Sequence, residues 1–125
     1  MNAKPKRSDR VSEALRVELS ALLARGVIRD PGVRDVIVTG VRVSDDLRHA
    51  RVYVRQLTDE QNAPQQEQLL SALRRASSFI RRELSPTLKL KYQPDLNFFW
   101  DDGLDRAARI EELLRDIKAE DEGRP

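Results

Sequence analysis

The sequence predicts a single α+β domain whose elements run in the order helix, strand, strand, helix, strand, helix. Two long segments carry apolar residues at every third or fourth position, which is the period of an amphipathic helix. Short segments between and after them alternate β-branched or aromatic residues with polar ones, the period of a half-buried strand. The chain of 125 residues is long enough to bury one core, and no linker divides it.

The first helix is expected from about Ser8 to Arg25. Its apolar face recurs at helical spacing and consists of Val11, Ala14, Leu15, Leu19 and Leu22. Ser8 or Asp9 is suited to cap its start, and Gly26 is suited to end it in the left-handed conformation. Asp30-Pro31-Gly32 then has the composition of a turn.

Two strands joined by a polar loop are expected next. The segment from Val36 to Val43 is rich in valine, and Gly40 stands where a bulge can shift the alternation. Ser44 to His49 is polar enough to connect a hairpin. The following strand alternates apolar positions with a basic outer face, as Ala50, Arg51, Val52, Tyr53, Val54 and Arg55. We expect these strands to pair antiparallel.

The central helix is expected from about Pro64 to Leu84, because proline suits a first helical turn and Ser85-Pro86 would stop the helix. The small residues Ala76-Ser77-Ser78 in its middle permit a bend. After it, Leu96, Phe98 and Trp100 share one face of a third strand.

A short final helix is supported by Ala107, Ile110, Leu114 and Ile117. We therefore expect one domain over residues 8–118. Residues 1–7 form a basic N-terminal tail in this interpretation, and residues 119–125 form a frayed C-terminal tail.

The central helix also carries a basic face. Its apolar stripe consists of Leu69, Leu73, Ala76, Ile80 and Leu84. On the opposite side lie Arg74, Arg75, Arg81 and Arg82, with Ser78 between the two rows. Such a helix can hold a core and face an anion, or the arginines can simply be a solvated surface.

Charge is unevenly distributed along the chain. Residues 1–100 hold 18 Lys+Arg and 12 Asp+Glu, whereas residues 101–125 hold 5 and 9. Between Arg74 and Lys91, six basic residues face the single acidic residue Glu83. This asymmetry is typical of proteins that bind nucleic acid and keep a separate acidic end. A basic isoelectric point alone also occurs in proteins without such a partner.

Catalytic chemistry is not indicated. The chain has no cysteine, so it has no disulfide, thiolate metal site or cysteine nucleophile, and His49 is its only histidine. The adjacent acids Asp45-Asp46 and Asp101-Asp102 are typical of turns, and no phosphate-binding loop or zinc-type cluster occurs. We expect no enzyme, cofactor or metal. No stretch approaches the roughly 20 apolar residues of a membrane span, so we expect a cytoplasmic protein.

Features that the sequence lacks exclude several types of nucleic-acid-binding module. Its five glycines never form Gly-x-x-Gly, the loop by which ordinary KH domains clamp a single strand. The arginine face has one aromatic residue, Phe79, at its margin, so we do not expect a base-stacking platform. What remains is recognition of phosphates by guanidinium groups.

The segment from Ser44 to Val54 resembles the signature hairpin of the ribosome-binding factor A family, bacterial factors of small-subunit assembly. The family pattern is Ser-x-Asp-Leu, two free positions, then Ala-x-Val-Tyr-Val. Here it is met by Ser44, Asp46, Leu47, Ala50, Val52, Tyr53 and Val54. Leu73 to Leu84 is similar to the family's Ala-x-Gly-Phe-Ile-Arg-x-x-Leu helix, and Pro94 to Phe98 to its Pro-x-Leu-x-Phe strand. The resemblance covers about Ser8 to Leu114.

The resemblance implies a type II KH-like domain with a mixed three-stranded sheet covered by helices, in which a kink at Ala76-Ser77-Ser78 replaces the Gly-x-x-Gly loop. It also implies binding to free small (30S) subunits and contact with 16S rRNA near its 5′ terminal helix and neck. The implied role is in late maturation and 16S rRNA processing, prominent in the cold, without catalysis. Two residues depart from the family pattern: Ser78 replaces the kink glycine, and Gly32 replaces an arginine of the turn.

Our leading hypothesis is a non-enzymatic assembly factor that docks its basic helix face, with neighbouring strand residues, onto structured ribosomal RNA. The residues expected to contact RNA are Arg74, Arg75, Ser78, Arg81, Arg82, Lys89, Lys91, Arg51, Lys4, Lys6 and Arg7. We expect a monomer with no small-molecule substrate. The sequence leaves open a protein-interaction module that acts through the acidic C-terminal helix, and a DNA-binding regulator.

Overall fold

The computed structural model describes residues 6–58, 62–103 and 114–115. Within these ranges the elements are α1 (Arg7–Ala24), β1 (Val36–Val43), β2 (His49–Gln56), α2 (Ala63–Leu88) and β3 (Asp95–Trp100). The predicted order of helices and strands is confirmed as far as the third strand. Apart from residues 114–115, the predicted final helix lies outside the described residues.

The three strands form one mixed sheet in the order β1-β2-β3. β1 pairs antiparallel with β2, and β2 pairs parallel with β3. The register shifts between Val38 and Gly40, so the bulge predicted near Gly40 is confirmed. Two parallel neighbours need a crossover connection, and α2 supplies it.

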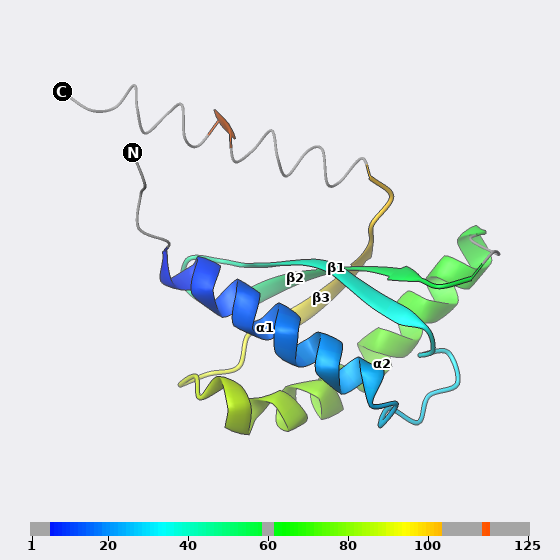
Figure 1. Ribbon diagram of the computed structural model, residues 1–125, viewed down its shortest axis with the longest axis horizontal. Helices are drawn as coiled ribbons and strands as arrows, with labels where there is room; N and C mark the ends of the chain where they lie inside the picture. The colour runs from blue at the N-terminus through cyan, green and yellow to red at the C-terminus, as the bar shows by residue number, and fades with distance from the viewer. Residues whose placement is uncertain (1–5, 59–61, 104–113, 116–125) are drawn as a thin grey trace.

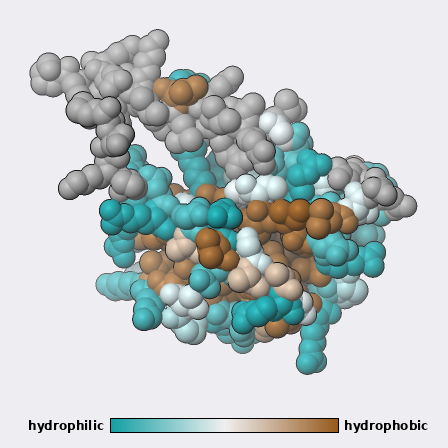
Figure 2. Space-filling view, in the orientation of Figure 1, coloured by the Kyte–Doolittle hydropathy of each residue, from teal (hydrophilic) through white to brown (hydrophobic). Residues whose placement is uncertain are grey.

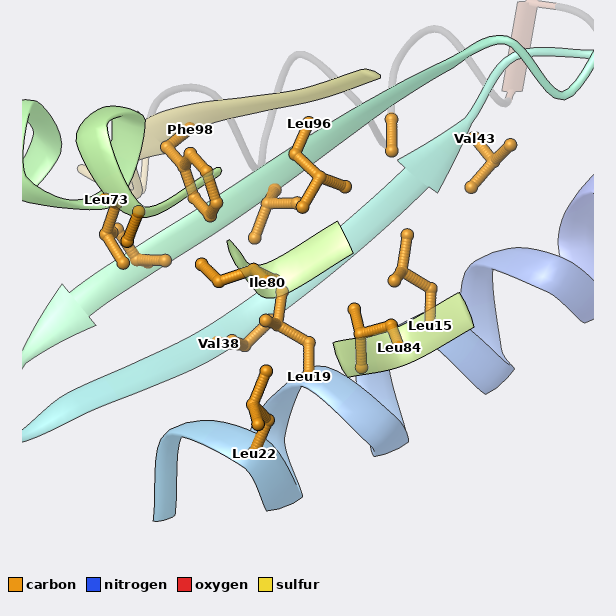
Figure 3. Packing of buried hydrophobic residues seen from close by; sticks show 14 of the residues in the cluster. Leu15, Leu19, Leu22, Val38, Val43, Leu73, Ile80, Leu84, Leu96 and Phe98 are labelled. Atoms are coloured by element: carbon orange, nitrogen blue, oxygen red, sulfur yellow. The ribbon is translucent and has the colours of Figure 1, made fainter. Parts of the chain in front are cut away.

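Both helices lie on the same side of the sheet, where they bury a common core (Figure 1). Figure 3 shows this core from close by: Leu15, Leu19 and Leu22 of α1 point toward the stripe of α2 and toward the inner face of the sheet. Phe98 of β3 packs in the same cluster and is 2% exposed. Burying each such side chain contributes about 1.5–3 kcal/mol, so these apolar faces hold the domain together. Ala14, predicted to lie on the face of the first helix, is instead exposed.

The outer surface of this layer is mixed rather than uniformly charged. On the side of the molecule where α1 lies, Figure 2 shows hydrophobic surface (brown) between hydrophilic residues (teal). The large apolar residues that remain exposed in the described chain include Val17, on α1, and Val27, just after it.

The start of α1 differs from the prediction. The N-cap residue is Lys6, whose backbone N–H donates to the Asp9 carboxylate over 3.1 Å. The prediction of a Ser8 or Asp9 cap was wrong because Ser8 is buried and its hydroxyl donates to Asp45 over 3.2 Å. This hydrogen bond ties the helix to the β1–β2 loop. At the other end, Gly26 has the expected positive φ of 65°.

The end of α2 also differs. The helix continues through Pro86 to Leu88 and ends at Lys89, whose φ is 51° and whose N–H donates to the Ser85 carbonyl over 3.2 Å. The prediction of a stop at Ser85-Pro86 was wrong because a proline in the last turn removes only one helical hydrogen bond. The added turn brings Leu88 against the core.

The middle of α2 stays helical at Ala76, Ser77 and Ser78. Figure 1 shows the helix changing direction between its first half (green) and its second half (yellow-green). Ala76 is buried, whereas Ser78 is exposed. Bending at these three residues in particular stays a prediction.

The loop of the signature hairpin is built by side-chain hydrogen bonds. The Ser44 hydroxyl donates to Asp46 over 2.6 Å and accepts from the His49 N–H over 3.1 Å. Asp46 also accepts from the Arg48 N–H over 3.1 Å. The hydrogen bond from Ser44, followed by that from Arg48, lowers the pKa of the Asp46 carboxyl. Leu47 completes the turn with a φ of 62°.

The strand half of the signature divides between the two faces of the sheet. Ala50, Val52 and Val54 are fully buried beneath the helices. Tyr53 points to the opposite face, where its ring lies 5.7 Å from that of Phe99. The signature residues therefore build the fold rather than a chemical site.

The Asp30-Pro31-Gly32 turn packs directly on α2. A Cβ at Gly32 would lie 2.9 Å from the Cβ of Ala72 and 3.4 Å from the carbonyl oxygen of Gln68. Glycine is required here because of this close approach, and the Gly32 N–H donates to Asp30 over 3.0 Å. The departure from the family pattern at this position thus has a packing reason.

We predict that Gly32→Ala destabilises the protein by about 1–3 kcal/mol, because the new methyl group overpacks the contact with Ala72. Urea unfolding measures this cost. The control is Ala72→Gly, which removes the opposing methyl group at a helix cost of about 1 kcal/mol. Gly32→Ala should then cost less in the Ala72→Gly background than in the wild type. An equal cost in both backgrounds would contradict the close contact.

Candidate nucleic-acid interface

The arginine face of α2, defined as Arg74, Arg75, Ser78 and Arg82, lies on the side of the helix away from the sheet. All four residues are exposed. On the same helix Leu73, Ile80 and Leu84 are buried in the core. Because the stripe fixes the rotation of the helix, the arginine face is held toward solvent along two turns.

Arg74 and Arg82 are the most available of these cations. Arg74 forms an ion pair with Glu67 over 3.1 Å, and both side chains are more than half exposed. Exposed pairs of this kind contribute about 0–1 kcal/mol, so a phosphate can displace Glu67. The guanidinium of Arg82 makes no ion pair with another described residue.

Arg75 is held in place by the turn that precedes β1. Its Nε donates to the Asp30 carboxylate over 3.0 Å, and the arginine side chain remains 62% exposed. The hydrogen bond from Arg75, followed by that from the Gly32 N–H, lowers the pKa of the Asp30 carboxyl. The remaining guanidinium nitrogens are available to an anion outside the protein.

Arg81 has a structural role that the sequence did not reveal. Its Nη2 donates to the Gln93 carbonyl over 3.0 Å and lies 3.5 Å from the Asp95 carboxylate. Its side chain is 36% exposed, less than those of Arg74 and Arg75. Arg81 therefore joins α2 to the start of β3, and it is the least available of the four helix arginines.

More basic residues gather at one end of the molecule. The end of α2 and the start of α1 lie on the same side in Figure 1 (left), and the Asp95 N–H donates to the Arg48 carbonyl there over 2.8 Å. The exposed residues at this end are Lys6, Arg7, Lys89 and Lys91. The Lys91 ammonium lies 5.5 Å from the centre of the Tyr92 ring, which is itself 72% exposed. Lys4 lies outside the described residues.

Arg51 lies apart from the arginine face. Its strand neighbours Ala50 and Val52 are buried under the helices, so Arg51 projects from the opposite face of the sheet. There it pairs in register with Arg42 on β1 and Asn97 on β3. The expectation that Arg51 and the helix arginines share one surface was wrong, and contact between Arg51 and RNA stays a prediction.

The sequence also missed the acidic partners of the arginines. Asp30 was expected to be a turn residue only, yet it binds Arg75 across 45 positions of the chain. No local sequence pattern indicates such an ion pair.

Within the described ranges, no helix is long and apolar enough to cross a membrane. The same ranges contain no group of three or more His, Cys, Asp and Glu side chains that could hold a metal ion.

The family model of ribosome-binding factor A matches residues 7–114. The chain belongs to the ribosome-binding factor A family. It is 43% identical over 118 residues to the ribosome-binding factor A of Sorangium cellulosum, covering 94% of both chains. It is 42% identical over 117 residues to that of Syntrophus aciditrophicus, covering 94% of this chain and 92% of the relative.

The fold agrees with this assignment. The crystal structure of ribosome-binding factor A from Thermus thermophilus superposes with a TM-score of 0.61 at 25% identity, covering 74% of this chain and 93% of that one. The family comprises non-enzymatic ribosome assembly factors. The resemblance found in the hairpin signature and the expectation of no catalysis are thereby confirmed.

We predict that Arg75→Gln raises the pKa of Asp30 toward its ordinary value, because the guanidinium hydrogen bond is the main cause of its lowered pKa. Carboxyl ¹³C NMR over a pH titration measures this change. A carboxyl with a lowered folded-state pKa stabilises the fold above its unfolded pKa, and this stabilisation is lost as the pH falls through the folded pKa. Arg75→Gln should reduce that acid-sensitive part of the stability, and the Gly32 N–H should keep the rest. Arg74→Gln is the control and should leave the Asp30 titration unchanged.

Proposed function

We propose that this chain is an assembly factor that binds free small (30S) ribosomal subunits and acts late in their maturation, including 16S rRNA processing. In this proposal the arginine face of α2 contacts 16S rRNA near its 5′ terminal helix. The observation that carries the proposal is that a helix buried on one side presents Arg74, Arg75 and Arg82 on the other, in a member of a family named for ribosome binding.

The chemistry of the arginine face suits folded RNA. Guanidinium groups bind phosphate oxygens through paired, charge-assisted hydrogen bonds. Such contacts position a protein on a nucleic-acid backbone and read its shape more than its base sequence. The positively charged surface continues beyond the end of α2, where the exposed basic residues are Lys6, Arg7, Lys89 and Lys91. A surface of this kind fits the curved phosphate backbone of an rRNA helix.

We predict that Arg74→Glu/Arg82→Glu loses binding to purified small subunits in co-sedimentation. The slope of log affinity against log salt should also decrease in magnitude by about 0.7–0.9 for each lost arginine. The matched control is Arg25→Glu/Arg34→Glu, which makes the same charge change at exposed positions outside this face. It should retain most of the binding.

Circular dichroism must show that both double variants are folded. Equal loss of binding in both would mean that only overall charge matters. Unchanged binding of the Arg74→Glu/Arg82→Glu protein would exclude the arginine face as the contact surface.

A further inference from the structure

A small apolar pocket opens beside the arginine face. Its volume is about 320 Å³, at the lower end of the range of ligand pockets, about 300–1,000 Å³. The walls are made by Val27, Ile28, Ala76 and Phe79, and the charged groups at its edge include Arg29 and Arg75. The pocket therefore lies between the segment after α1 and the middle of α2.

The geometry of α2 places an aromatic ring next to a fixed cation. Phe79 follows Arg75 by four positions, so the two side chains are neighbours on one side of the helix. Arg75 is oriented by its hydrogen bond to Asp30 over 3.0 Å. Phe79 is half-buried, so the pocket is open to molecules from solvent.

The other wall, formed by Val27 and Ile28, is only partly used by the core. Val27 is 40% exposed although it is aliphatic, while Ile28 packs partly against the core. Arg29 follows and is exposed. The pocket has apolar walls, one of them aromatic, and two arginines at its edge. Such a pocket suits a ligand with a flat ring and a negatively charged group attached to it.

We propose that this pocket takes one unstacked base of the RNA, stacked against Phe79, while the adjoining phosphates bind Arg75 and Arg29. The proposal rests on the proposed function and adds a single-nucleotide site to it. Proteins recognise RNA largely through unpaired bases that stack on aromatic or arginine side chains. The charge of the pocket favours a nucleotide over an apolar protein segment. Among the described residues that line the pocket, Asp30 is the one acid, and it is already paired with Arg75.

The proposed slot is compatible with the expectation from the sequence that the arginine face has no base-stacking platform. Phe79 is the only aromatic residue near the arginine face in sequence, and one ring on a helix makes no platform. The second wall comes from Val27 and Ile28, about 50 positions earlier in the chain. The site is a slot for one base rather than a stacking surface for several.

The test compares Phe79→Leu with Phe79→Tyr in binding to purified small subunits. Leucine keeps an apolar side chain but removes the ring, so affinity should fall by about 5-fold or more. Tyrosine keeps the ring and should bind within about 2-fold of the wild type. Thermal melting checks that both variants are folded. Wild-type affinity of folded Phe79→Leu would overturn the proposal.

A second variant closes the pocket from its exposed side and does not alter Phe79. Val27→Trp should weaken binding as Phe79→Leu does, whereas Val17→Trp, at a comparably exposed position on α1, should not. Equal binding by the two tryptophan variants would count against an occupied pocket.

Ultraviolet cross-linking of the wild-type complex identifies the occupant. Trypsin cleaves after Arg75 and Arg81, so the peptide Ala76–Arg81 reports on Phe79. A nucleotide adduct on this peptide supports the proposal, and a ribosomal-protein adduct overturns it. If the wild type itself does not bind small subunits, the proposed function fails. If the wild type, Phe79→Leu and Val27→Trp all bind and Arg74→Glu/Arg82→Glu does not, the proposed base pocket is wrong and the proposed function stands.

Discussion

The contact between the apolar stripe of α2 and the inner face of the sheet is the constraint on which the rest of the structure depends. Figure 3 shows Ile80 among the core side chains near Val38 and Leu19, and Leu73 near Phe98. Because the crossover between the parallel strands β2 and β3 passes through α2, this contact fixes the topology. It also fixes the rotation of the helix, since a shift by one residue would bury an arginine. One packing interaction therefore determines both the core and the direction of the arginine face.

The four arginines of α2 are not equivalent, because they differ in their acidic neighbours. On the arginine face, Asp30 orients Arg75 and Glu67 pairs weakly with Arg74. Arg81, outside that face, lies near Asp95, and Arg82 makes no ion pair with another described residue. Weak exposed pairs are easily exchanged for phosphate contacts, and an oriented guanidinium loses less entropy on binding. The family signature in the hairpin belongs to the fold instead, since Ser44 and Asp46 bond within their own loop. Family membership and RNA contact are thus carried by different parts of the chain.

Much of the fold could be predicted because local patterns encode it. The alternation around Val52 gives the strand and its buried face, and the spacing of Leu73, Ile80 and Leu84 gives the helix and its stripe. What the sequence could not show depends on contacts between distant segments. The approach of Gly32 to Ala72, the pairing of Asp30 with Arg75 and the wall that Val27 adds opposite Phe79 have no local signal. Arg51 is an intermediate case. The alternation of the strand predicted that its side chain is exposed, but it did not predict that both helices cover the other face of the sheet.

The most direct test of the account is to map which face of the protein lies against rRNA. The chain has no cysteine, so single cysteines at Ser78, on the arginine face, and at Asn97, exposed on the opposite face of the sheet, can each carry an iron chelate that generates hydroxyl radicals. In the complex with small subunits, we expect the probe at position 78 to cleave 16S rRNA strongly and the probe at position 97 to cleave it weakly. Strong cleavage from position 97 without cleavage from position 78 would contradict the account.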